Sequence, residues 1–220
     1  MPDFTVEPKN VLNTRLQDLI GDRFIQKCGN SEREREETSL TETATIDKLD
    51  GIKFVGLFFS ADWCPPCKHM LQPLKNFYTD VNLQERTFEI ILVSSDRTQE
   101  EWKRHHATMP WMTLPFEDPR ANMLREKFEI LGVPALIILD AVTGFTVTEK
   151  ARKDLKKDVK EVYESWDKLL DLKKANAVER ARLDAVAQAQ RAEREWREKQ
   201  KKEAEKQAAE GAAQVEAAVV

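Results

Sequence analysis

The chain of 220 residues contains only three cysteines, Cys28, Cys64 and Cys67, which is too few for the disulfide framework of a small secreted protein. No apolar run approaches the ~20 residues that a membrane-spanning helix needs, so no membrane partner is expected. The first residues, MPDFTVEPKN, have no basic segment followed by an apolar one, so no signal peptide is expected. These absences predict a reduced protein of the cytoplasm, and a nuclear or ciliary location also agrees with them.

The chain also lacks an excess of positive charge. Its formal net charge is −4, so the composition gives no indication of a nucleic-acid partner. Charged residues nevertheless make up 34% of the sequence, which is high for a compact domain. Part of the chain should therefore be a solvated helix or tail.

The apolar residues cluster in short runs separated by helical patterns. Near-continuous apolar runs of this length are typical of strands buried on both faces of a sheet. The expected strands are residues 53–60, 88–95, 133–140 and 145–150, and the expected helices are 65–81, 96–109 and 119–129. A helix between the first two strands implies a right-handed parallel crossover. The pattern predicts an α/β domain over residues 21–153, preceded by an N-terminal segment, residues 1–20.

The C-terminal part, residues 154–220, has no glycine or proline before Gly211 and is expected to be helical. An apolar stripe from Val159 to Leu172 is suited to packing on the domain. From about residue 173 the stripe thins among charged residues and alanines, and the heptad register is too polar for a self-sufficient coiled coil. Two interpretations stay open here: a solvated helical tail, or a helix that docks a protein partner.

The stretch FFSADWCPPCKHM places Cys64 where the first strand gives way to the first helix, and Cys67 within that helix. Cys64 therefore falls at the first helical turn, where the helix dipole favours a thiolate, the reactive form in thiol–disulfide exchange. Pro65 is tolerated there because its missing N–H would have no helical partner. Cys67 follows one turn later and can resolve a mixed disulfide formed by Cys64. The spacing predicts a redox-active Cys64–Cys67 pair that needs no other cofactor.

The cysteine pair has two other interpretations. A zinc site usually needs four ligands, which the three cysteines and His69 could in principle supply, but Cys28 is distant in the chain and His69 lies on the same helix as the pair. No metal is therefore expected. A buried structural pair without chemistry is the second alternative, and the strand–helix context favours the redox interpretation over it.

Four ordered blocks, FSADWCPPCKHMLQPLKNFY, FEIILVSSDRTQEEW, MPWMTLPFED and GVPALIILDAVTG, resemble the tryparedoxin and nucleoredoxin branch of the thioredoxin superfamily. The resemblance covers roughly Ile20 to Arg152. It implies a thioredoxin fold, a central mixed sheet flanked by helices, here followed by a long C-terminal helical extension. It also implies dithiol–disulfide oxidoreductase activity with Cys64 as nucleophile and Cys67 as resolving thiol.

The resemblance implies further site residues around the two cysteines. Pro134 would be a cis-proline beside the site, and the backbone of Val133 would pair with an extended substrate. Trp63 would shield the dithiol, and Arg152 would contact an anionic substrate. The two prolines of the WCPPC core, Pro65 and Pro66, complete the expected substrate-binding set.

One departure from the wider family concerns proton transfer. Thioredoxins place a buried aspartate six residues before the first cysteine, where this chain has Phe58. The proton acceptor for Cys67 is therefore not identified by the resemblance.

Several other residues are of types that can bind a metal, react or contact a substrate, and for most of them a structural role is expected. His105 and His106 lie on a polar stretch beside Lys103 and Arg104 and are expected on a solvated helix face. Cys28 is expected to be a buried or incidental cysteine. The expected place of Trp102 is the core, whereas Trp111 is equally compatible with a loop at a substrate groove.

Two functions follow from these observations. The first is an oxidoreductase that reduces disulfides of client proteins such as peroxidases, with electrons from a low-molecular-weight dithiol or a flavoprotein reductase. The second is a thioredoxin-like structural or adaptor module of a larger assembly, for example cytoskeletal or ciliary, docked by the C-terminal helix.

Overall fold

The two longest apolar runs form the central strands of a sheet in the computed structural model, which describes residues 16–27 and 41–217. β3 (Phe54–Ser60) and β4 (Phe88–Ser94) are parallel, and α3 (Pro65–Val81) connects them. Every residue of β3 is buried, as expected for a strand covered on both faces. The pairing confirms that the predicted strands are parallel and that a helix connects them.

Five further strands complete a seven-stranded mixed sheet in the order β2-β1-β5-β4-β3-β6-β7. On one side of β3, β6 and β7 follow in antiparallel pairing. On the other side, β5 is parallel to β4, and β1 and β2 are antiparallel to their neighbours. The bounds are β1 (Arg23–Lys27), β2 (Thr41–Thr45), β5 (Met112–Thr113), β6 (Ala135–Asp140) and β7 (Thr146–Thr148).

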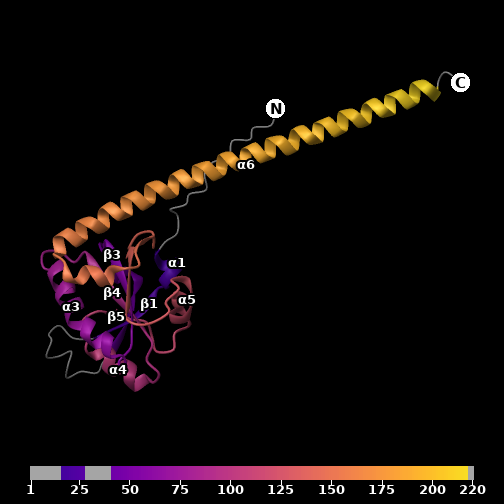
Figure 1. Ribbon diagram of the computed structural model, residues 1–220. Coiled ribbons are helices and arrows are strands. Elements are labelled where there is room, and N and C mark those ends of the chain that lie inside the picture. Colours follow the sequence, from indigo (N-terminus) through magenta and orange to yellow (C-terminus); the bar gives the residue numbers. More distant parts are fainter. Residues whose placement is uncertain (1–15, 28–40, 218–220) are drawn as a thin grey trace. The chain divides into compact units, whose positions relative to one another are not determined.

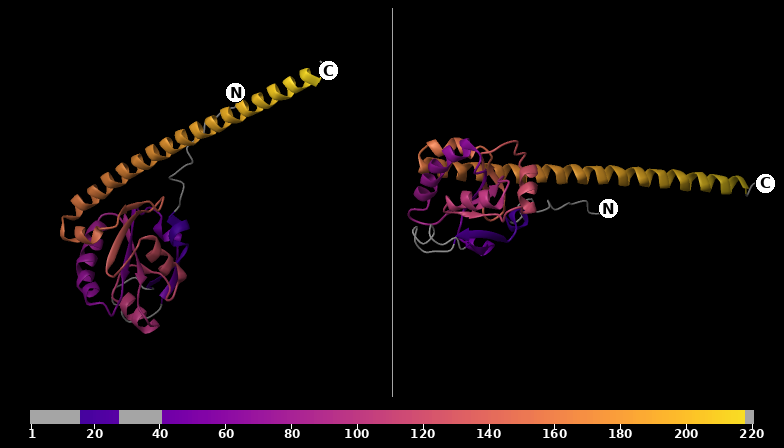
Figure 2. Two further views of the ribbon diagram at one scale, coloured as in Figure 1. Left: turned by 45° about the vertical axis from the view of Figure 1, so that its right-hand side comes forward. Right: turned by 90° about the horizontal axis from the view of Figure 1, so that it is seen from below.

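Helices cover both faces of this sheet (Figures 1 and 2). The side chains of β3 alternate between the faces, because successive residues of a strand point to opposite sides. Val55, Leu57 and Phe59 pack with α1 (Leu16–Ile20) and α5 (Pro119–Lys127). On the opposite face, apolar residues of β3, β4 and β6 pack with α3 and with the first turns of α6 (Val159–Ala217). Within residues 16–27 and 41–217, the other helices are η1 (Ile46–Leu49), α4 (Gln99–Ala107) and η2 (Ala151–Lys156).

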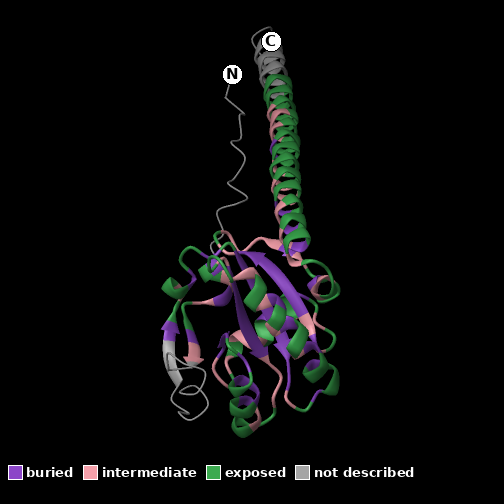
Figure 3. Cartoon of the chain, turned by 90° about the vertical axis from the view of Figure 1, so that its left-hand side faces the viewer, coloured by how far each residue is buried: buried purple, intermediate pink, exposed green. Residues whose placement is uncertain are grey.

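The long C-terminal helix, α6, belongs to two parts of the chain. Residues Leu12–Lys173 form one compact unit, and the helix from Lys174 onward belongs to another. Val162, Trp166 and Leu170 are buried in the first unit, whereas the later turns are mostly exposed (Figure 3). Among the described residues, no helix is both long enough and apolar enough to cross a membrane.

The observed elements confirm the predicted fold class, a mixed sheet flanked by helices and followed by a long helix. The sequence pattern does not predict α1, β1 or β2, the described elements before residue 46. α1 contributes the buried Leu16 and Ile20 to the core, and β1 and β2 form one edge of the sheet. The stretch 110–118 between α4 and α5, for which the sequence predicts neither helix nor strand, contains the two-residue strand β5.

Candidate active site

The two cysteines lie where β3 ends and α3 begins. Cys64 is the N-cap residue of α3, with φ −95° and ψ 107°, and Pro65 and Pro66 are the first two helical residues. Prolines are tolerated at this point because the first helical N–H groups have no partner within the helix. The backbone N–H of Cys67 donates to the carbonyl oxygen of Cys64 at 3.0 Å, so the two residues share one side of the first turn. The prolines are exposed, whereas both cysteines are buried.

Both cysteines are free thiols, with exposed fractions of 4% for Cys64 and 1% for Cys67. The Cys64 Sγ donates to the carbonyl oxygen of Val133 at 3.7 Å, and the Val133–Pro134 peptide bond is cis. Val133 also packs against the cluster of Ala61, Cys64 and Cys67. The structure therefore brings Val133 and Pro134 to the dithiol, where the resemblance implies them.

The two thiols differ in their surroundings. Burial, together with a hydrogen bond to Cys64, raises the pKa of Cys67 from its ordinary value of 9.0 to about 11, although Ser60 and the backbone of Ala61 oppose this shift. Cys67 is therefore a neutral thiol near neutral pH and must lose a proton before it can attack a disulfide. Cys64 occupies the end of the helix where backbone N–H groups and the helix dipole favour a negative charge. This division suits a nucleophilic first cysteine and a protonated second one.

Trp63 has a more open position than shielding of the dithiol requires. Its side chain is 44% exposed, and its Nε1–H donates to the carbonyl oxygen of Ser95 at 3.1 Å. The guanidinium of Arg97 lies over the indole ring, 4.9 Å from the ring centroid. The loop after β4 thus holds the indole in place, and part of its ring remains available to a bound protein.

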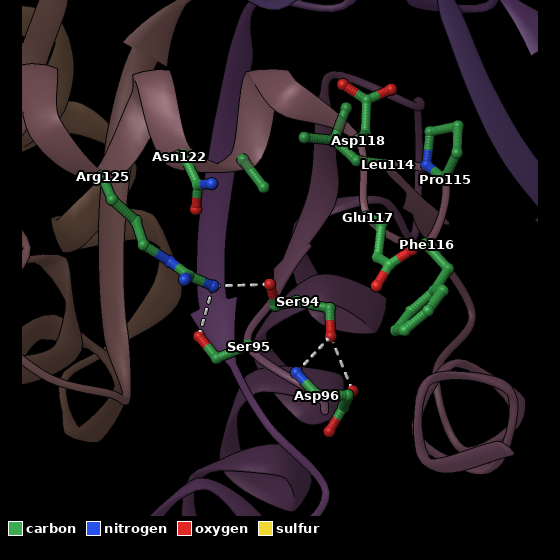
Figure 4. A pocket seen from close by; sticks show the side chains of 11 residues that line it. Ser94, Ser95, Asp96, Leu114, Pro115, Phe116, Glu117, Asp118, Asn122 and Arg125 are labelled. Carbon is green, nitrogen blue, oxygen red and sulfur yellow. Dashed lines mark hydrogen bonds between the residues drawn. The ribbon is translucent and has the colours of Figure 1, made fainter. Parts of the chain in front are cut away.

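A polar cavity of about 350 Å³ adjoins the same loop (Figure 4). Arg125 of α5 crosses it and donates hydrogen bonds to the carbonyl oxygen of Ser94 and to the hydroxyl of Ser95. Burial lowers the pKa of Arg125, and its Nε is buried without a hydrogen-bond partner in the part of the chain that the structure describes. Sequence reasoning missed this cavity because its walls come from segments far apart in the chain. The lining residues are Ser94, Ser95, Asp96, Leu114, Pro115, Phe116, Glu117, Asp118, Ala121, Asn122 and Arg125.

The prediction that His105 and His106 lie on a solvated face is wrong. Their exposed fractions are 4% and 2%, and both rings hydrogen-bond inside the protein. His106 Nε2 lies 3.0 Å from the carbonyl oxygen of Trp111, and the His105 ring lies between the side chains of Ser60 and Asp96. Burial is compatible with these polar rings because each has hydrogen-bond partners.

Trp102 and Trp111 are both buried. Trp102 is buried on the same face of α4 as the two histidines, which confirms its predicted core position. Trp111 is also buried, and it packs edge-on against Phe58 and Tyr78 rather than lining a substrate groove.

Three further expectations concern residues outside this cluster. Arg152 is an exposed residue of η2, and among the described residues no hydrogen bond or ion pair joins it to the cysteines. Cys28 lies outside the described residues. Within residues 16–27 and 41–217, no group of three or more histidine, cysteine or acidic side chains could hold a metal ion.

Comparison with known proteins shows which family the chain resembles. The thioredoxin-like family model matches residues 51–146, which include both cysteines and the cis-proline. "Probable nucleoredoxin 1" of Arabidopsis thaliana is 42% identical over 100 residues, which are 46% of this chain and 17% of that protein. Nucleoredoxin of Xenopus laevis is 35% identical over 126 residues, which are 57% of this chain and 29% of that protein.

Solved structures show the same relationship. Tryparedoxin I from Leishmania major is 35% identical, with a TM-score of 0.51, and the match covers 62% of this chain and 86% of that one. Tryparedoxin II from C. fasciculata is 29% identical, with a TM-score of 0.54, and the match covers 65% of this chain and 87% of that one. The chain thus spans most of the length of these tryparedoxins but less than a third of the two nucleoredoxins.

Proposed function

Because the chain belongs to the thioredoxin-like family, in its tryparedoxin and nucleoredoxin branch, we propose that it reduces protein disulfides through Cys64 and Cys67. The observation that carries this proposal is the pair of free thiols on the first turn of α3, beside the carbonyl of Val133. No other cofactor is required, because the dithiol itself carries the two electrons.

The proposed reaction has two exchange steps. The Cys64 thiolate attacks one sulfur of the client disulfide, and the other client sulfur leaves as a thiolate. Cys67 then loses its proton and attacks the Cys64 sulfur, which releases the second client thiolate and forms the Cys64–Cys67 disulfide. A low-molecular-weight dithiol or a flavoprotein reductase restores the dithiol and is itself oxidised.

The substrate-binding residues follow from their positions around the dithiol. We propose that Trp63, Pro65 and Pro66 offer an exposed apolar surface to a client, such as a peroxidase with a disulfide. The backbone at Val133 and Pro134 would pair with the client segment that holds the attacked cysteine. Arg152, exposed in η2, would contact an acidic group of the client. A reducing compartment, with the cytoplasm as first choice, suits this chemistry.

The test combines turnover with trapping. The reduced protein, supplied with excess dithiothreitol, should accelerate reduction of a protein disulfide such as that of insulin. A Cys67→Ser variant should instead accumulate a covalent complex with the client, which mass spectrometry would assign to Cys64. The proposal would be contradicted if the protein failed to accelerate reduction and the variant captured no client.

The exposed part of α6 favours a second candidate function, that of a tethered or adaptor module. Val178, Leu183 and Val186 are exposed apolar side chains of α6, in the unit that begins at Lys174. This function is compatible with the first, because an oxidoreductase can be positioned by a docking helix in a larger, for example cytoskeletal or ciliary, assembly.

Deletion of residues 174–220 separates the two functions. It should leave insulin reduction within about twofold of the full chain, because the deleted turns lie outside the compact unit that holds the dithiol. Co-purification of the full and the shortened chain from cells would then measure docking. Loss of the same partners with unchanged turnover would support the adaptor role, and unchanged partners would contradict it.

A further inference from the structure

Cys67 has to lose a proton in a place that water reaches poorly. Its exposed fraction is 1%, and burial is the main reason why its pKa is raised to about 11. Phe58, which replaces the aspartate of thioredoxins, is fully buried in an apolar cluster and cannot accept a proton. The resolving step therefore needs an acceptor from another part of the fold.

The hydroxyl of Ser60 is the first group in contact with Cys67. Ser60 is the last residue of β3, it is fully buried, and its side chain hydrogen-bonds to the Cys67 thiol. Its Oγ also lies 3.2 Å from Nε2 of His105, a buried residue of α4. A hydroxyl both donates and accepts, so Ser60 can link the thiol to the imidazole.

Asp96 fixes the orientation of His105 from the opposite side. One carboxylate oxygen lies 3.0 Å from Nδ1 of His105 and accepts from the Ser94 hydroxyl at 2.7 Å, and the other accepts from the Asp62 backbone N–H at 2.6 Å. Burial opposes ionisation of Asp96, but these hydrogen bonds outweigh it and hold its pKa below its ordinary value. An ionised carboxylate only accepts, which assigns the proton to Nδ1; when the imidazole is uncharged, Nε2 is then the acceptor that faces Ser60.

We propose that Ser60, His105 and Asp96 form a proton relay for Cys67, an inference that rests on the proposed disulfide reductase function. When Cys67 attacks the Cys64–client disulfide, its proton passes to the Ser60 oxygen while the Ser60 proton passes to Nε2 of His105. The S–S bond between Cys64 and the client breaks, and the client leaves as a thiolate. Asp96 stabilises the resulting imidazolium. When a donor dithiol reduces the Cys64–Cys67 disulfide, the same proton returns through Ser60 to the departing Cys67 thiolate.

Two other charged groups lie near the relay. Arg125 of α5 donates to the carbonyl oxygen of Ser94 and to the hydroxyl of Ser95. Asp62, whose backbone N–H bonds Asp96, forms ion pairs with Lys68 of α3 at 3.4 Å and with Arg104 of α4 at 3.2 Å. The neighbouring histidine, His106, is buried to a similar degree but hydrogen-bonds to the Trp111 carbonyl instead. It therefore provides a matched control on the same helix.

The experiment uses the full-length protein in a Cys28→Ser background and a small aromatic disulfide, dithiobis(nitrobenzoate). The reduced protein releases one coloured thionitrobenzoate when Cys64 attacks and a second when Cys67 resolves, so rapid mixing measures each step separately. The variants are Ser60→Ala and His105→Gln, which interrupt the relay at different points, and His106→Gln as the control. Thermal unfolding and near-ultraviolet circular dichroism verify that each variant is folded.

At neutral pH, Ser60→Ala and His105→Gln should leave the first step within about threefold of wild type and slow the second at least about thirtyfold, because general-base assistance is lost. In both variants the second rate should then rise about tenfold per pH unit toward the Cys67 pKa, because only hydroxide removes the proton. The wild type and His106→Gln should show a shallower rise.

Two results would overturn the relay alone. The first is that, in both variants, the rate of the second step lies within about threefold of its rate in His106→Gln. The second is that both steps are slowed equally, which indicates a structural role. If His105→Gln did not fold, Ser60→Ala would decide, because it removes a single oxygen. A wild-type protein that releases no second thionitrobenzoate would overturn the proposed function, and the relay with it.

Discussion

Replacement of Cys64 by serine should lower the rate of disulfide reduction by at least about a thousandfold, because a serine hydroxyl is a far weaker nucleophile than a thiolate. The substitution changes little else. Cys64 caps α3 through its backbone conformation, without a side-chain capping hydrogen bond, and serine is favoured at such positions. The measurement is insulin reduction with dithiothreitol as donor, corrected for the uncatalysed rate.

Two further cysteine variants make this prediction specific. Cys67→Ser should also lose turnover but keep a single attack by Cys64, so that it is consumed as a mixed disulfide. Cys28→Ser should retain wild-type turnover, because the sequence assigns it no redox partner. If Cys64→Ser kept more than about a tenth of the activity, the nucleophile would have to be another group.

The sequence predicts the central strands because their apolar runs are long and unbroken. β3, β4 and β6 have apolar side chains on both faces. A near-continuous apolar run of this kind is typical of a strand that is covered on both faces of a sheet. The edge of the sheet has no comparable signal. Among Arg23–Gln26 of β1, Phe24 alone is fully buried, and β2 reads TETAT, a polar strand that pairs on one side. Such strands are held by their neighbours rather than by their own pattern.

For the candidate site too, the sequence predicts what lies within one segment and not what the fold brings together. The cysteine pair can be predicted from sequence because strand, cysteines and helix are adjacent in the chain. The proposed relay joins Ser60, Asp96 and His105, which are brought together only by the fold of β3, β4 and α4. Spacing within one segment cannot reveal a cluster of this kind.

The wrong prediction for His105 and His106 has a related cause. Charged neighbours made the stretch look solvated, although Trp102, the two histidines and Met109 recur at helical spacing and are all buried. This stripe was the available signal for a buried helix face. Histidine is polar enough to be read as surface and is readily buried when both of its nitrogens find partners.

The second large effect concerns stability. Trp166→Ala should lower the free energy of unfolding by about 3–5 kcal/mol, because the indole is fully buried and its loss leaves a cavity. The ring packs against Phe54, Phe77 and Phe88, with centroid distances of 5.5–5.8 Å. Its Nε1–H also donates to the carboxylate of Asp154 at 3.2 Å, a hydrogen bond that alanine cannot replace. Urea unfolding followed by circular dichroism would measure the change.

Leu183→Ala on the later turns of α6 is the matched control. Leu183 is exposed, and leucine and alanine are both good helix formers, so the free energy of unfolding should change by less than about 0.5 kcal/mol. The contrast between two positions of one helix tests whether its first turns are part of the domain that carries the dithiol. A loss below about 1 kcal/mol for Trp166→Ala would contradict this, since burial of an aromatic side chain alone is worth more. A large loss for Leu183→Ala would instead mean that the later turns are packed against a partner that contributes to stability.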